Sequence, residues 1–189
     1  MIQIVFTTNS DNVFSIKNEY IMPLWYYSDN FMLFNTIIGG SDYNIVIMGN
    51  NTYKNLNMRK YKDKSLYVLT KKHKQYTSHD DLIYFNNLED AIMLAMEQSK
   101  KYKNCKISII GGLQLILEAL NLDTYKDEYK IFHNISLNPK KYNIDICDYF
   151  PLNKITENYE LDIKYTEIIK QLFPLSNCNI YIKSKNTIV

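Results

Sequence analysis

The amino-acid sequence predicts an α/β protein with a central, mainly parallel sheet. Short apolar runs rich in β-branched residues are each followed by a helix-type segment, and this alternation occurs four times before about residue 122. The rest of the chain carries strand-type runs with no helical pattern between them, which predicts antiparallel strands added at a sheet edge. A length of 189 residues with 46% hydrophobic content suits one domain, spanning residues 1–189, with a full core.

The first part of the chain predicts a strand, a loop and a helix. Residues 2–8 are apolar and β-branched and predict a strand, whereas residues 9–20 are polar and turn-rich and predict a loop. In residues 28–38, apolar side chains such as Phe34 and Ile38 recur at three- and four-residue spacing. This spacing predicts an amphipathic helix with one apolar face.

The next stretch has the pattern of a phosphate-binding turn. Residues 44–48 read as a buried strand, Gly49 lets the backbone turn sharply, and residues 50–52 (Asn-Asn-Thr) offer cap-type side chains for a helix. Backbone N–H groups at such a helix start can hold phosphate. A purely structural strand-to-helix turn is the alternative reading of this stretch alone.

A second turn of the same kind follows later in the chain. Residues 106–110 predict a buried strand, Gly111 and Gly112 the turn, and residues 113–120 a helix. Two such turns in one α/β domain could straddle the pyrophosphate of a dinucleotide. The pattern lacks the G-x-G-x-x-G fingerprint, so a Rossmann fold is not favoured.

The remaining elements are predicted from the same patterns. Asn86 or Asn87 can cap a helix that has acidic residues in its first turn and lysines in its last. The predicted ranges are strands at 65–70 and 82–85, a helix at 88–101, and strands at 130–136, 159–167 and 179–185.

Charge and cysteine content exclude several classes of protein. The net charge is +2 without a basic block, so nothing indicates a nucleic-acid partner. No apolar run approaches the roughly 20 residues that span a bilayer, so no membrane partner is expected. Cys105, Cys147 and Cys178 are scattered and lack metal-ligand spacing, so we expect free thiols, no metal and a cytoplasmic location.

Taken together, the segments resemble the dihydrofolate reductase family over nearly the whole chain. The sequence V-I-M-G-N-N-T-Y at residues 46–53 is close to the family's V-I-M-G-x-x-T-[WY] signature, and residues 109–112 match its I-G-G turn. Residues 22–25 resemble its Pro-Trp motif with one residue extra, and residues 148–151 are similar to its D-x-x-F-P element. The resemblance implies a mixed, mainly parallel eight-stranded sheet flanked by helices. It also implies a monomer that uses NADPH to reduce 7,8-dihydrofolate to tetrahydrofolate.

The resemblance also implies a set of site residues. Lys64 stands where the family keeps an Arg for the folate α-carboxylate; a Lys keeps the charge but loses the bidentate fork. The residues implied for substrate are Val5, Phe6, Phe34, Leu56 and Lys64. Those implied for the cofactor are Thr7, Phe14, Ser15 and Met22 beside the nicotinamide, Thr70, Lys71 and Lys72 near the 2′-phosphate, and Gly49, Asn50, Asn51, Thr52, Ile110, Gly111, Gly112, Leu113 and Gln114 at the phosphate turns.

The position of the family's catalytic acid is open in this chain. The family carries one Asp or Glu on its first helix, which hydrogen-bonds the pterin and assists protonation. Counting from Pro23 places Asp29 there. Counting back from Phe34, or forward from Trp25, places Asn30 there. Asn30 lies within about 40° of Phe34 on a helix and Asp29 about 140° away, which favours Asn30, while Asp29 suits an N-cap.

An asparagine cannot supply a proton, which leaves two hypotheses about function. His133 occupies the position of a family Thr that hydrogen-bonds the acid, and it would titrate near working pH, so it could partly replace the acid. A packed side chain is the plainer reading of this His. The alternative function is a catalytically degenerate reductase-fold protein that binds a nucleotide or a partner without turnover. The related reductase of riboflavin synthesis is a third reading, which the motifs fit less well.

Overall fold

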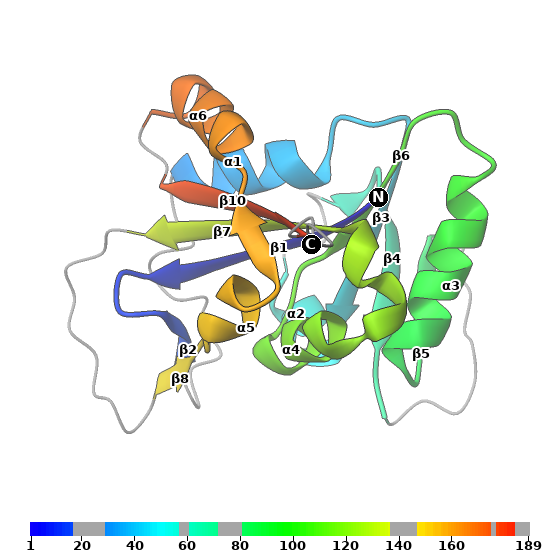
Figure 1. Cartoon of the computed structure of the whole chain (residues 1–189). Helices are drawn as coiled ribbons and strands as arrows, with labels where there is room; N and C mark the ends of the chain where they lie inside the picture. Colours follow the sequence, from blue (N-terminus) through cyan, green and yellow to red (C-terminus); the bar gives the residue numbers. More distant parts are fainter. Residues whose placement is uncertain (17–28, 57–60, 72–80, 137–146, 175–176, 184–189) are drawn as a thin grey trace, which may run out of the picture.

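The computed structural model describes residues 1–16, 29–56, 61–71, 81–136, 147–174 and 177–183. Its centre is an eight-stranded sheet with the order β5-β4-β3-β6-β1-β7-β10-β9 (Figure 1). Neighbouring strands from β5 across to β7 run parallel, and β10 and β9 add antiparallel pairs at one edge. The predicted mixed, mainly parallel eight-stranded sheet is therefore confirmed. The strands are β1 (Ile2–Asn9), β3 (Tyr43–Gly49), β4 (Ser65–Leu69), β5 (Leu82–Phe85), β6 (Cys105–Ile109), β7 (Tyr129–Ser136), β9 (Tyr159–Leu161) and β10 (Cys178–Lys183).

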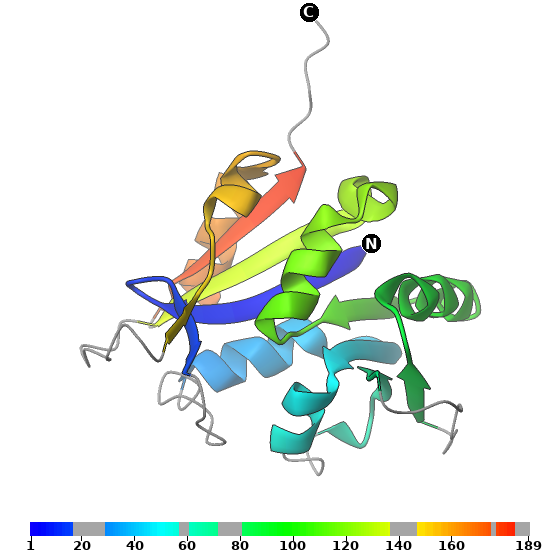
Figure 2. The same ribbon diagram turned by 90° about the horizontal axis from the view of Figure 1, so that it is seen from below.

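Helices cover both faces of the sheet (Figures 1 and 2). They are α1 (Asp29–Ile38), α2 (Asn50–Asn55), α3 (Leu88–Ser99), α4 (Leu113–Asn121), the 3-10 helix η3 (Asp123–Glu128), α5 (Asn153–Thr156) and α6 (Ile163–Leu172). The α1-side cluster is one core; its buried members are Val5, Leu33, Ile37, Ile38, Val46, Met48, Tyr61, Leu66, Val68, Ile110, Phe132, Cys178 and Ile180. The other core, here the α4-side cluster, includes Ile4, Phe6, Phe14, Ile47, Ile92, Ile116, Ile131 and Phe150.

The two cores follow from alternation along each strand. In β1, Ile4 and Phe6 belong to the α4-side cluster, whereas Val5 between them belongs to the α1-side cluster. Successive side chains of a strand point to opposite faces, so the apolar runs of the sequence bury both faces. No helix within the described ranges is long and apolar enough to cross a membrane.

Helix α1 runs back along the sheet toward the beginning of the strands. The Nζ of Lys106, at the second position of β6, donates to the carbonyl oxygens of Ile37 (3.3 Å) and Gly39 (2.5 Å), which lie at the C-terminal end of α1. A lysine at this end satisfies carbonyls that have no intrahelical donor. The first turn of α1 therefore lies toward the carboxyl ends of β6 and β1 (Figure 1).

Two sequence-based predictions are wrong. Val13–Ile16 is strand β2 rather than part of a loop, and it pairs with β8 (Cys147–Tyr149) in a separate two-stranded sheet. Its partner lies more than a hundred residues away, so no local pattern reveals the pairing. The second concerns residues 159–167, for which the sequence predicts one strand.

Residues 159–167 form a strand of only three residues, and a helix begins soon after it. Strand β9 stops at Leu161, and Asp162 caps α6 by accepting a hydrogen bond from the N–H of Tyr165 (3.0 Å). The cap outweighs the strand preference of the β-branched and aromatic residues that follow it. The predicted antiparallel pairing of the two last strands is confirmed, but α6 lies between them in the chain.

Candidate active site

The two glycine turns meet at the carboxyl edge of the sheet. The N–H of Gly49 donates to the carbonyl oxygen of Gly111 at 2.8 Å, and the N–H of Ile110 donates to that of Ile47 at 3.0 Å. A Cβ on Gly112 would lie 3.7 Å from Thr52 Oγ1. The starts of α2 and α4 therefore lie side by side, as the two-turn prediction requires.

Both turns leave backbone donors for a ligand. Gly49 and Gly112 occupy the N-cap positions of α2 and α4, and neither cap has a side chain that accepts from the helix. The first N–H groups of a helix have no partner within it, and the dipole of α4 favours an anion at this end. Gly111 has a φ of +117°, a conformation that favours glycine. The edge is suited to phosphate.

The remaining residues implied for the cofactor fall into three groups: those after β4, those in the first turns of α2 and α4, and those outside the described residues. Thr70 follows β4 at the same edge and donates its N–H to Phe85 O at 2.8 Å, and Lys71 beside it is exposed. Asn50, Asn51, Thr52, Leu113 and Gln114 are exposed or partly exposed in the first turns of α2 and α4. Met22 and Lys72 lie outside the described residues.

Strand β2 brings Phe14 to the glycine turns. A Cβ on Gly111 would lie 3.6 Å from Phe14 Cζ, so this ring borders the turn, and its place beside the cofactor stays a prediction. The hydroxyl of Ser15 instead donates to Asp148 Oδ2 across the β2–β8 pair, at 2.8 Å. This hydrogen bond joins β2 to β8, and its acceptor, Asp148, belongs to the D-x-x-F-P element.

The residues implied for substrate do not all lie together. Val5 is a buried member of the α1-side cluster, and Phe34 and Leu56 pack against it, partly buried. Thr7, two residues after Val5, lies on the same face of β1. Phe6 belongs to the opposite core, so the structure corrects its predicted place beside Val5 in one pocket.

His133 is also on the opposite face from α1. It is fully buried, its ring stacks on Phe6 with centroids 4.7 Å apart, and Nε2 lies 2.8 Å from Thr8 Oγ1. The Thr8 hydroxyl also lies within hydrogen-bond distance of the carbonyl oxygen of Asn9, at 3.0 Å. Burial lowers the pKa of His133 to about 4. The expectation that it titrates near neutral pH beside the acid position is therefore corrected.

Asn134 is a polar residue of β7 whose position in the strand places it on the same face as Phe132, toward α1. It pairs with Thr7 of β1 and Cys178 of β10, and it is 5% exposed. Among the described residues, neither its Oδ1 nor its Nδ2 has a hydrogen-bond partner. Sequence reasoning missed Asn134 because motif counting placed His133 there. Phe132 is an apolar residue on the α1 face, and side chains two residues apart in a strand share a face. Counting from Phe132 therefore identifies Asn134.

The choice between Asp29 and Asn30 remains a prediction. Both begin α1, and the backbone places that turn toward the carboxyl ends of β6 and β1. Their side chains lie outside the described part of the structure. Along the described ranges, no group of three or more His, Cys, Asp or Glu side chains could hold a metal ion.

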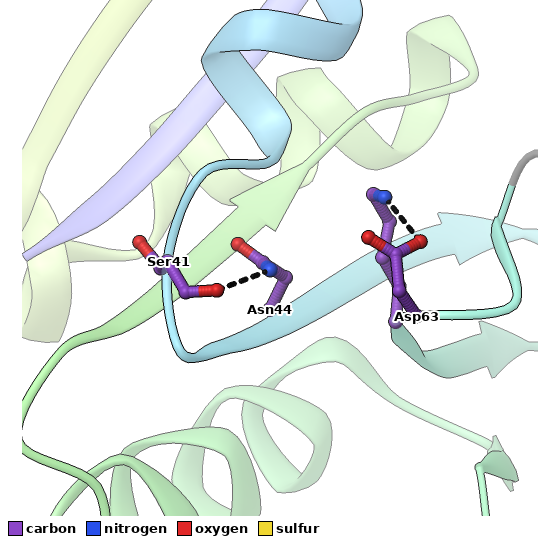
Figure 3. Close-up of polar contacts among 4 residues, drawn as sticks. Ser41, Asn44 and Asp63 are labelled. Atoms are coloured by element: carbon purple, nitrogen blue, oxygen red, sulfur yellow. Dashed lines mark hydrogen bonds and ion pairs between the residues drawn. The ribbon is translucent and has the colours of Figure 1, made fainter.

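Lys64 lies just before β4 with its ammonium shielded from water. Its side chain is 7% exposed, and Nζ lies 2.7 Å from Oδ1 of Asp63 (Figure 3). The ammonium also lies 5.8 Å from the centroid of the Tyr61 ring. Leu66, two residues on, belongs to the α1-side cluster, so alternation places Lys64 on the α1 side of the sheet. Its role toward substrate stays a prediction.

A mainly parallel sheet with glycine turns at its carboxyl edge is typical of α/β proteins that bind phosphate-bearing ligands at the strand ends. The sequence model of the dihydrofolate reductase family matches residues 1–136, and the chain belongs to this family. Its fold is similar to that of the dihydrofolate reductase of Schistosoma mansoni, with a TM-score of 0.70 and 17% identity over 97% of this chain and 98% of that one. No curated protein matches the sequence. Family and fold support dihydrofolate reduction as the general reaction.

Proposed function

We propose that the protein reduces 7,8-dihydrofolate to tetrahydrofolate with NADPH as the hydride donor. The observation that carries this proposal is the contact between the glycine turns, in which Gly49 N–H donates to Gly111 O at 2.8 Å. That contact juxtaposes two helix starts with uncapped N–H groups, which suits a pyrophosphate. In keeping with the free cysteines, we propose a cytoplasmic, single-domain monomer.

The chain offers residues for each part of the cofactor. The N–H groups at the start of α4 and the Thr52 hydroxyl would hold the phosphates, and exposed Lys71 would pair with the 2′-phosphate as a point charge. Phe14, beside Gly111, would close one side of the nicotinamide position and exclude water. When bound there, NADPH supplies the hydride.

The α1 face offers the groups that would orient the pterin. The carboxamide of Asn134 can donate and accept at once, as the amide edge of a pterin requires, and it has both functions free among the described residues. Val5 and Phe34 supply the apolar walls. Asn134 can orient a pterin but cannot protonate it, so turnover depends on the residue at the start of α1.

The test is NADPH oxidation with dihydrofolate across pH, for the wild type, Asp29→Asn and Asn30→Asp. Strong wild-type turnover that Asp29→Asn abolishes would assign the acid to Asp29. Weak wild-type turnover that Asn30→Asp raises by orders of magnitude would assign the acid position to Asn30 and describe a weakened reductase. Absence of turnover in all three would overturn the proposal.

One observation favours the alternative of binding without turnover. Buried His133 has a pKa of about 4 and faces away from α1, so it is no substitute acid at neutral pH. If Asn30 occupies the acid position, the described part of the pocket offers no proton donor. Calorimetric binding of NADPH by an inactive protein would support this alternative.

A further inference from the structure

Lys64 already has a carboxylate partner from its own chain. Its Nζ lies 2.7 Å from Oδ1 of Asp63, the preceding residue, and the Lys64 side chain is 7% exposed. The Asp63 side chain is 71% exposed, so its carboxylate lies at the surface while the Lys64 side chain is buried. Ion pairing with Lys64 holds the pKa of Asp63 below its usual value, so the carboxylate is charged at neutral pH.

The pair lies beside the face proposed for substrate. Phe34 and Leu56 pack against the α1-side cluster, and Tyr61, whose ring centroid is 5.8 Å from the ammonium, belongs to it. On the neighbouring strand β3, Asn44 is held in place by donating to the carbonyl oxygen of Ser41 at 3.0 Å (Figure 3). The family resemblance places the acidic end of an extended folate ligand at Lys64, the end remote from its ring.

We propose that Asp63 is a specificity-determining residue that competes with the acidic tail of a substrate for Lys64 and so shifts the preference toward reduced pterins without such a tail. The inference rests on the proposed function. A lysine ammonium is a compact charge without the two-pronged geometry by which an arginine binds two oxygens of a carboxylate. A tail carboxylate must therefore displace Asp63 or bind beside a like charge, and both weaken its binding. A pterin without a tail avoids this competition.

The experiment compares two ligands and two variants. Calorimetry gives Kd, and NADPH oxidation gives KM and kcat, for 7,8-dihydrofolate, which carries a benzoylglutamate tail, and for 6-methyl-7,8-dihydropterin, which does not. The test variant is Asp63→Asn. The control is Asp81→Asn, which removes the same charge from an exposed residue just before the adjacent strand β5.

We expect Asp63→Asn to tighten dihydrofolate binding roughly three- to tenfold, the range of an ion pair of about 1 kcal/mol. Binding of the tailless pterin should change less than about twofold, and Asp81→Asn should change neither ligand. Adding Lys64→Met to Asp63→Asn should abolish the gain, because the double variant has no ammonium to release.

The outcomes separate this inference from the proposed function. If Asp63→Asn leaves dihydrofolate binding unchanged, weakens it, or strengthens both ligands equally, the competition is refuted while reductase activity stands. If neither pterin binds to any variant, the proposed function fails, and the inference fails with it. Selective tightening without turnover would support the competition and contradict the proposed reaction alone.

Discussion

His133 Nε2 lies 2.8 Å from Thr8 Oγ1, in hydrogen-bond contact, and both residues are fully buried between β7 and β1. Phe6 covers one face of the imidazole, and among the described residues Nδ1 has no hydrogen-bond partner. A second proton on the ring would be a buried charge without a compensating partner, and burial therefore lowers the pKa of this histidine to about 4. The neutral ring is part of the core.

His133 should make the stability of the protein depend on acid pH. Its pKa is about 6.5 when unfolded and about 4 when folded, so the unfolded state binds the proton more readily between these values. The stabilisation is present above about pH 6.5 and is lost as the pH falls toward 4, by on the order of 3 kcal/mol. Urea unfolding at several pH values would measure this loss.

The control for this prediction is His133→Asn, which keeps a polar side chain but does not titrate. Its free energy of unfolding should vary less between pH 6.5 and 4 than that of the wild type. An equal slope in both proteins would contradict the low pKa. Because the ring faces away from α1, the substitution should also leave the shape of the pH–rate profile near neutrality unchanged.

Gly111 should tolerate a side chain much less well than Gly49. At Gly111 the φ of +117° is strained for any L-residue, so Gly111→Ala should cost about 1–3 kcal/mol of stability. Gly49 has a φ of −76°, and its nearest new contact would be 3.7 Å from Gly112 N, so Gly49→Ala should cost much less. Thermal unfolding of both variants measures the difference. Equal losses would contradict the backbone argument.

The Asn134 side chain should lower the free energy of unfolding while strengthening the binding of dihydrofolate. Its buried carboxamide has no protein partner among the described residues, an arrangement that costs roughly 1–3 kcal/mol. Asn134→Leu, of similar shape, should therefore raise the free energy of unfolding by about 1–2 kcal/mol. It should also weaken dihydrofolate binding, because the pterin loses a donor and an acceptor.

Asn134→Gln is the matched control for polarity, since it keeps the amide but lengthens the side chain. It should not stabilise the protein, and chemical unfolding with calorimetric binding would compare the two variants. A leucine variant that is less stable than the wild type would show that the carboxamide has a partner in the folded protein.

The sequence predicts most of the fold because the burial patterns are local. The apolar runs of β3 and β6 and the period of α1 each follow from which residues are buried. Strand β2 could not be predicted, since it is held by β8 from the other end of the chain. The site is harder still: an error of one residue in motif counting separates His133 from Asn134, and in a strand this reverses the face.

Lys130 and Tyr165 should anchor α6 to the sheet. The Lys130 side chain is 8% exposed, and its ammonium lies 3.1 Å from the centroid of the Tyr165 ring in the first turn of α6. Because Tyr165 is 49% exposed, a contact of this kind stabilises by about 1 kcal/mol. Tyr165→Leu should lose that amount and Tyr165→Phe should retain most of it, since the ring remains. Urea unfolding distinguishes them, and equal losses would show that the hydroxyl rather than the ring face stabilises α6.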